Sequence, residues 1–114
     1  IGSNSSVMLE TLAGSRLGIW VAHGEGKFSL PLSEEEYSIP AKYTYDRYPG
    51  NPNGSDYNAA AIVSNDGRHL AMMPHLERSI YPWNWAYYPG NRSDDVSPWI
   101  EAFVNARKWV EKRG

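Results

Sequence analysis

Apolar residues recur with two periods along this chain, and they predict strands before residue 75 and a helix at the end. The run 17–23 is continuous and of strand length, which is typical of a central strand covered on both faces. Two further apolar runs, 59–63 and 69–73, flank Asn65-Asp66-Gly67, and Asp-Gly between apolar runs strongly favours a β-hairpin. Alternation over 41–45 predicts one more strand, so we expect a mixed sheet that contains a hairpin.

The last element is a predicted helix with a clear start. Ser97 suits the N-cap, and Pro98 suits the first helical position, where its missing N–H costs nothing. Helical spacing then predicts one buried face, made of Trp99, Phe103, Ala106 and Val110. Upstream, 27–30 alternates weakly and predicts a short strand, and Ser33 followed by three glutamates predicts a short helix.

Two segments allow more than one interpretation. The loop 49–55 consists almost entirely of turn-forming residues. It is either a simple connection or a loop that fixes the geometry of a functional site, and neither interpretation is favoured. Four of the five tryptophans lie in the last third of the chain, where core packing is favoured over a stacking platform for a sugar or a base.

Composition narrows the class of protein. A chain of 114 residues forms one domain at most. Its net charge is −2, so it does not have the excess of basic residues that is typical of a nucleic-acid-binding protein. No apolar run is long enough to span a bilayer, no signal-peptide pattern opens the chain, and residues 1–6 read as a flexible lead-in. The chain has no cysteine, which excludes a disulfide framework and fits a cytoplasmic protein.

The sharpest chemical signal follows the second strand of the predicted hairpin. His75 and Glu77 are two residues apart, so on an extended backbone both side chains leave from the same face. A histidine beside a carboxylate suits a catalytic base and the group that orients it, although a purely structural histidine is the simpler interpretation. His23 and Glu25 form a second such pair, and a metal site shared by both pairs is the weaker hypothesis, because the spacing matches no metal motif.

Six segments, distributed in order over residues 15–112, carry a resemblance to a known family: Val21-Ala22-His23-Gly24-Glu25-Gly26, Tyr48-Pro49-Gly50-Asn51-Pro52-Asn53-Gly54-Ser55, Asp66-Gly67-Arg68, Met72-Met73-Pro74-His75-Leu76-Glu77-Arg78, Ser97-Pro98-Trp99 and Asn105-Ala106-Arg107. In this order they resemble the glutamine amidotransferase domain at the carboxy-terminal end of the phosphoribosylformylglycinamidine synthase (FGAM synthase) family, in its large single-chain form.

The resemblance implies an α/β fold, the C-terminal half of a flavodoxin-like class I glutamine amidotransferase domain over residues 1–114. Such domains hydrolyse glutamine and pass ammonia to a synthetase domain, which uses ATP and Mg to convert formylglycinamide ribonucleotide to its amidine in purine biosynthesis. The family's Met-Pro-His-Pro-Glu-Arg motif maps the catalytic histidine and its carboxylate partner onto His75 and Glu77. No cofactor and no metal are implied for this part of the domain.

This sequence departs from the family pattern in two ways. Leu76 stands where the family often has proline, which we expect to loosen the local backbone without removing a reacting group. The nucleophilic cysteine is missing, and the resemblance places it upstream of the first matching segment, so we expect this chain to be inactive alone and to self-associate or retain an upstream fragment. Two alternatives stay open: a non-catalytic docking module, and the small glutaminase subunit of a split FGAM synthase.

Overall fold

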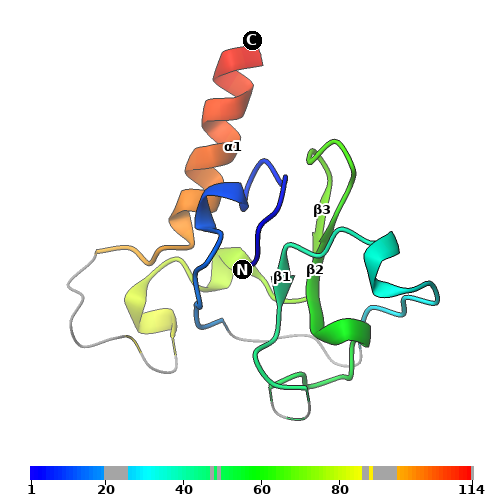
Figure 1. Cartoon of the computed structure of the whole chain (residues 1–114). Helices are drawn as coiled ribbons and strands as arrows, with labels where there is room; N and C mark the ends of the chain where they lie inside the picture. The colour runs from blue at the N-terminus through cyan, green and yellow to red at the C-terminus, as the bar shows by residue number, and fades with distance from the viewer. Residues whose placement is uncertain (20–25, 47, 49, 86–87, 89–94, 114) are drawn as a thin grey trace.

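The computed structural model, which describes residues 1–19, 26–46, 48, 50–85, 88 and 95–113, places a small antiparallel sheet beside a C-terminal helix (Figure 1). The sheet has three strands in the order β1-β2-β3. The strands are β1 (Ala41–Lys42), β2 (Ala59–Val63) and β3 (Leu70–Met72), and the helix is α1 (Ile100–Arg113). Single 3-10 turns connect them: η1 (Glu10–Leu12), η2 (Glu34–Glu36), η3 (Asp56–Asn58), η4 (Leu76–Arg78) and η5 (Pro82–Asn84).

The predicted hairpin is confirmed. Strands β2 and β3 pair antiparallel, with Ala61 opposite Met72 and Val63 opposite Leu70. Gly67 takes a φ of +75° in the turn, a left-handed conformation that glycine adopts without strain. The Ser64 hydroxyl and the Asp66 carboxylate lie 2.6 Å apart and tie the turn together.

The prediction of a mixed sheet with a central strand at 17–23 was wrong as far as the structure describes it. All three strands pair antiparallel, and residues 17–19 join none of them. Instead the Gly18 carbonyl accepts a hydrogen bond of 2.8 Å from the Trp99 indole N–H, so a side chain occupies a group that a sheet neighbour would use. Residues 20–23 lie outside the described part of the chain.

The short strand predicted at 27–30 does not form, because side chains also occupy its backbone N–H groups. Phe28 and Leu30 are buried, as alternation requires, but the N–H of Phe28 bonds the Ser55 hydroxyl and that of Leu30 bonds the Asp56 carboxylate. The strand predicted at 41–45 is reduced to the two residues of β1.

The acidic turn at η2 forms where a short helix was expected. It spans three residues, and the Ser33 side chain makes no capping hydrogen bond to it.

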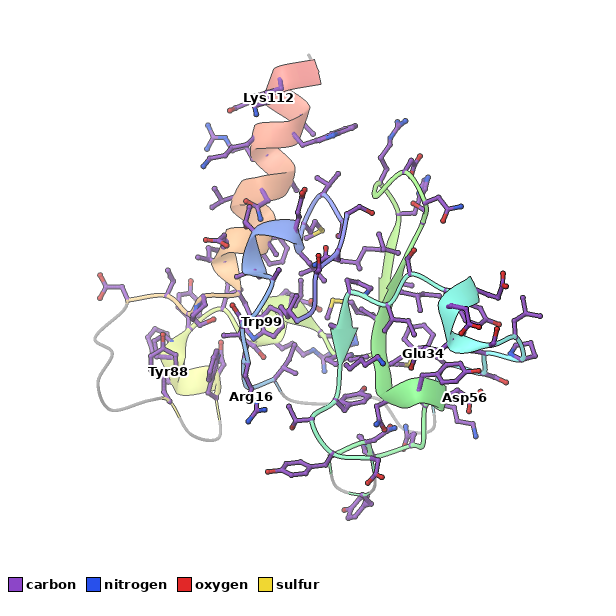
Figure 2. The ribbon with its side chains drawn as sticks, in the orientation of Figure 1. Arg16, Glu34, Asp56, Tyr88, Trp99 and Lys112 are labelled. Atoms are coloured by element: carbon purple, nitrogen blue, oxygen red, sulfur yellow. The ribbon has the colours of Figure 1, made fainter. Side chains whose placement is uncertain are left out.

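Helix α1 forms as expected, but its buried face differs from the prediction. Phe103 is 38% exposed and Val110 is 61% exposed, whereas Ala102 is fully buried. The small Ala102 side chain lets the first turn of α1 approach η1, where the Asn105 amide donates to the Met8 carbonyl over 3.0 Å. Figure 2 places Trp99 at the foot of α1 and Lys112 at its far end, away from the sheet.

The amino-terminal segment lies against the hairpin. Ser6 is fully buried, the Val7 N–H donates to the Gly67 carbonyl over 2.9 Å, and the Gly2 N–H donates to the Pro40 carbonyl over 3.0 Å. This segment joins two apolar clusters, one around Leu9, Leu12, Leu76, Trp99 and Ala102 and one around Ala41, Ala60 and Ala61. Among the described residues, no helix has the length and apolar character needed to cross a membrane.

Candidate active site

The two candidate residues lie at the start of η4, shortly after β3: His75 is its N-cap and Glu77 lies within it. Pro74 and Leu76 are buried, so their side chains anchor this short segment in the interior on either side of His75. His75 keeps an extended backbone and stands at the N-cap position, and its carbonyl accepts the Arg78 N–H over 3.2 Å. The chain therefore turns directly after His75, and the turn returns Glu77 toward the histidine ring.

The structure brings His75 and Glu77 together. Nδ1 of His75 lies 2.7 Å from Oε1 of Glu77, with the two side chains 43% and 61% exposed. Because an ionised carboxylate only accepts hydrogen bonds, Nδ1 must carry the proton in this pair. In the neutral ring Nε2 then holds the free lone pair, which is the state that a general base requires.

The carboxylate is held in its charged form. The pKa of Glu77 is lowered from its ordinary value, first by a hydrogen bond from its own backbone N–H and next by the hydrogen bond with His75. A carboxylate that stays ionised at neutral pH can orient an imidazole continuously.

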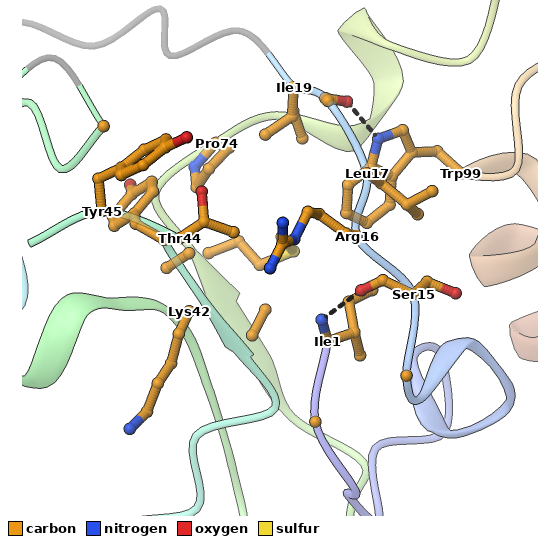
Figure 3. Close-up of a pocket in the computed structure, with 18 residues that line it drawn as sticks. Ile1, Ser15, Arg16, Leu17, Ile19, Lys42, Thr44, Tyr45, Pro74 and Trp99 are labelled. Atoms are coloured by element: carbon orange, nitrogen blue, oxygen red, sulfur yellow. Dashed lines mark hydrogen bonds between the residues drawn. The ribbon is translucent and has the colours of Figure 1, made fainter. Parts of the chain in front are cut away.

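A cavity of about 260 Å³ adjoins the pair. Its walls include His75, Glu77 and Pro74 together with apolar side chains from β3 and from the first turns of α1, namely Leu70, Met72 and Phe103. A larger cavity of about 680 Å³ shares only Pro74 and Met72 with it and is reached by neither His75 nor Glu77. Arg16 extends into this larger cavity between Thr44 and Leu17 (Figure 3). The smaller cavity is the candidate site, because His75 and Glu77 line it.

Leu76 has a role that the sequence did not predict. Its side chain is 6% exposed and belongs to the apolar cluster with Leu9, Leu12, Trp99 and Ala102. The residue that replaces the family's proline therefore secures η4 through packing. The continuing apolar run 70–73 was the only signal in the sequence that this region is interior.

The turn-rich loop near residue 51 is built around one buried amide. Asn51 is 4% exposed; its side chain donates to the Ser55 carbonyl over 3.0 Å and accepts the Ser55 N–H over 3.1 Å. Tyr57 and Asn58 follow with φ values of +55° and +56°, which cost free energy in residues other than glycine. None of these side chains lines the cavity at His75, so a role in holding the loop is the supported one.

The second His-x-Glu pair, His23 and Glu25, lies outside the described residues. In the part of the chain that the structure describes, no group of three or more potential ligands is gathered in a way that could hold a metal ion.

The tryptophans divide between core and surface. Trp99 is 3% exposed, which fits the packing interpretation, whereas Trp83 is 74% exposed and stacks on Tyr81 with ring centroids 4.6 Å apart. Such a stacked pair at the surface is a candidate contact for another protein surface.

Comparison with known proteins places this chain in a family. The sequence model of the CobB/CobQ-like glutamine amidotransferase domain matches residues 1–110. The chain is 39% identical over 123 residues to phosphoribosylformylglycinamidine synthase of Homo sapiens, covering 96% of this chain and 9% of that protein. It is 44% identical over 128 residues to a probable phosphoribosylformylglycinamidine synthase, chloroplastic/mitochondrial, of Arabidopsis thaliana, covering 97% and 9%.

A third relative, phosphoribosylformylglycinamidine synthase of Saccharomyces cerevisiae, is 40% identical over 124 residues, covering 95% of this chain and 9% of that protein. The chain thus spans about a tenth of the length of the relatives that it matches. Since the family match extends over almost every residue, the chain belongs to the CobB/CobQ-like glutamine amidotransferase domain family.

Proposed function

We propose that this chain is the His–Glu portion of the glutaminase domain of an FGAM synthase. The observation that carries the proposal is the 2.7 Å contact between His75 Nδ1 and Glu77 Oε1, on a turn beside a cavity that both residues line. The similarity to FGAM synthases of three eukaryotes supports the same reaction in purine biosynthesis, with glutamine as the ammonia donor.

The proposed chemistry divides one difficult hydrolysis into two easier steps. His75 first takes the thiol proton of a cysteine at Nε2. The thiolate then attacks the carboxamide carbon of glutamine, and the imidazolium gives that proton to the departing ammonia. His75 then takes a proton from the water that cleaves the thioester and releases glutamate. Glu77 keeps Nδ1 protonated, so that Nε2 always faces the reaction.

The nucleophile has to come from outside these 114 residues, because the chain contains no cysteine. We propose that it lies in sequence preceding this segment in the parent protein, on the other half of a flavodoxin-like domain. The partner that receives ammonia is the ATP- and Mg-dependent synthetase domain of the same parent chain, and the proposed location is the cytoplasm.

The deciding experiment uses the parent protein with His75→Ala. We expect glutamine-dependent FGAM synthesis to fall by about 10³-fold or more, since the base serves both steps. Synthesis supplied with ammonium salt should continue, because the synthetase domain is untouched. Retention of glutamine-dependent synthesis in this variant would exclude the catalytic role and favour the docking-module alternative.

The exposed Tyr81–Trp83 stack favours docking as a second contribution of this chain to the parent protein. In the parent protein, Trp83→Ser should weaken the coupling of glutamine hydrolysis to synthesis while leaving hydrolysis itself within about twofold, because residue 83 does not line the cavity at His75. Equal loss of both activities would contradict a docking role.

A further inference from the structure

The turn that carries Glu77 ends at a buried serine. Ser79 is fully buried, and its N–H donates to the Leu76 carbonyl over 3.0 Å, which closes η4. Because Glu77 lies between these two residues, the position of Ser79 determines the direction in which the Glu77 side chain leaves the turn.

Two side chains hold Ser79 in place through a single atom. Its carbonyl oxygen accepts a hydrogen bond of 2.5 Å from the Ser97 hydroxyl and one of 2.9 Å from the Trp85 indole N–H. The next carbonyl, that of Ile80, accepts the Ser97 N–H over 2.6 Å. The backbone just after η4 is therefore bonded to Ser97 twice.

Ser97 also starts the helix. Its hydroxyl accepts the Trp99 N–H over 3.3 Å, and its carbonyl accepts the Ile100 N–H over 3.1 Å. Ser97 is 1% exposed, so its hydrogen bonds are made in the interior, where water cannot replace them. One residue thus connects the start of α1 to the end of the turn that bears the His–Glu pair.

We infer that Ser97 is a positioning residue for the His75–Glu77 pair, an inference that rests on the proposed function. The heads of both side chains are partly open to water, so little packing surrounds them and their relative placement depends on the backbone of η4. Loss of the Ser97 hydroxyl leaves Ser79 with one side-chain donor, frees the end of the turn and weakens the contact between Glu77 and His75.

The tautomer of His75 gives a direct measurement of that contact. In a chain labelled with ¹⁵N at histidine, the imidazole nitrogen shifts at about pH 8 report the ratio of the Nδ1–H to the Nε2–H form, and Glu77 favours the first. His75→Gln identifies which of the three histidine signals belongs to residue 75. Glu77→Ala gives the ratio expected when the contact is absent.

We expect Ser97→Ala to lower the Nδ1–H to Nε2–H ratio about two- to threefold, part of the way to the Glu77→Ala value. The matched control is Ser6→Ala: Ser6 is also fully buried, and its hydroxyl also accepts backbone N–H groups at the start of a turn, those of Met8 and Leu9, which belong to the segment around η1 and not to η4. Both substitutions should lower the free energy of unfolding, and only Ser97→Ala should change the tautomer ratio.

Two further variants test the inference if Ser97→Ala does not fold. Ser97→Thr keeps a hydroxyl and should keep the wild-type ratio, and Trp85→Phe removes the other donor to the Ser79 carbonyl and should lower the ratio. An unchanged ratio in folded Ser97→Ala, or an equal change in Ser6→Ala, would overturn the inference. An unchanged ratio in Glu77→Ala would instead show that the pair itself is not formed, and the proposed function would lose the observation on which it stands.

Discussion

At position 76 the side chain decides how firmly the turn between His75 and Glu77 is held. Leu76 is 6% exposed and packs with Leu9, Leu12 and Trp99. We expect Leu76→Ala to lower the free energy of unfolding by about 2–4 kcal/mol, through lost burial and the cavity left behind. Chemical denaturation monitored by tryptophan fluorescence measures this.

A matched substitution separates packing from residue type. Leu32 is 58% exposed, so Leu32→Ala should change the free energy of unfolding by less than about 0.5 kcal/mol. Equal effects at the two positions would mean that Leu76 does not pack as the structure shows.

The lowered pKa of Glu77 predicts how the free energy of unfolding changes with pH. Its pKa is lowered in the folded chain, first by its own backbone N–H and then by His75, so the folded state favours the ionised form. That contribution is present above the unfolded pKa of a glutamate and is lost as pH falls through the lower folded value. We therefore expect wild type to be more stable than Glu77→Gln at about pH 7, with the difference shrinking between about pH 5 and pH 3.

The measurement is the free energy of unfolding of wild type minus that of Glu77→Gln at each pH. The other carboxylates titrate in both proteins, so their contributions cancel in this difference. A difference that stays constant, or that grows toward acid, would contradict the lowered pKa.

Sequence reasoning found the residues of the pair but not their support. The spacing of His75 and Glu77, after an apolar run, paired two residues that lie 2.7 Å apart, but a 3-10 turn, and not the expected extended backbone, brings them together. The bond from Ser97 to Ser79 joins residues 18 apart in the sequence, and no local pattern encodes such a contact. Ser97 could be recognised from sequence only as a helix cap.

At the level of elements, the turn of the β2–β3 hairpin lies in close contact with the amino-terminal segment. Gly67 has a φ of +75°, and a Cβ there would collide with the Ser5 carbonyl oxygen of the amino-terminal segment. Gly54 has the same φ, but a Cβ there meets nothing within 4 Å. We expect Gly54→Ala to cost about 1 kcal/mol from backbone strain alone, and Gly67→Ala to cost clearly more, because the Val7–Gly67 hydrogen bond must also shift.

Thermal unfolding of the two alanine variants tests this comparison, since both carry the same intrinsic penalty. Equal losses would show that the amino-terminal segment does not lie on the turn, as expected for the flexible lead-in that the sequence suggests for residues 1–6.

The elements that were predicted well are those encoded by neighbouring residues. Turn chemistry at Asp66-Gly67 identified the hairpin, and the cap at Ser97 identified the helix. The buried helix face was missed because it depends on what lies opposite: η1 contacts Ala102 and Asn105, and this leaves Phe103 38% and Val110 61% exposed. Residues 17–19 failed as a strand for a comparable reason, since the Trp99 indole binds the Gly18 carbonyl from 81 residues away.

At the scale of the whole molecule, apolar side chains remain on the outside of α1. Phe103 is 38% exposed, Val104 41% and Val110 61%, although solvent-facing helix positions are usually polar. We expect the isolated chain to self-associate, with a molar mass by light scattering above the 12.9 kDa of one chain. The double variant Phe103→Lys/Val110→Lys should shift the mass toward that of the monomer, whereas the control Lys108→Glu, on the same helix, should not. A wild-type mass of one chain across micromolar concentrations would contradict the prediction.

In the proposed function, His75 and Glu77 form a base and its orienting group without a nucleophile, so the isolated chain should not release ammonia from glutamine. A base at Nε2 can activate water, but direct hydrolysis of a carboxamide lacks the thioester that divides the barrier, and removing the nucleophile of a triad typically costs about 10⁶-fold in rate. We therefore expect pure chain to be indistinguishable from buffer in a coupled glutamate dehydrogenase assay, and His75→Ala to be the same. Ammonia release by the pure wild-type chain that His75→Ala abolishes would mean that some other group among these residues attacks the amide. Serine hydroxyls would then be the groups to test, because the chain contains no thiol.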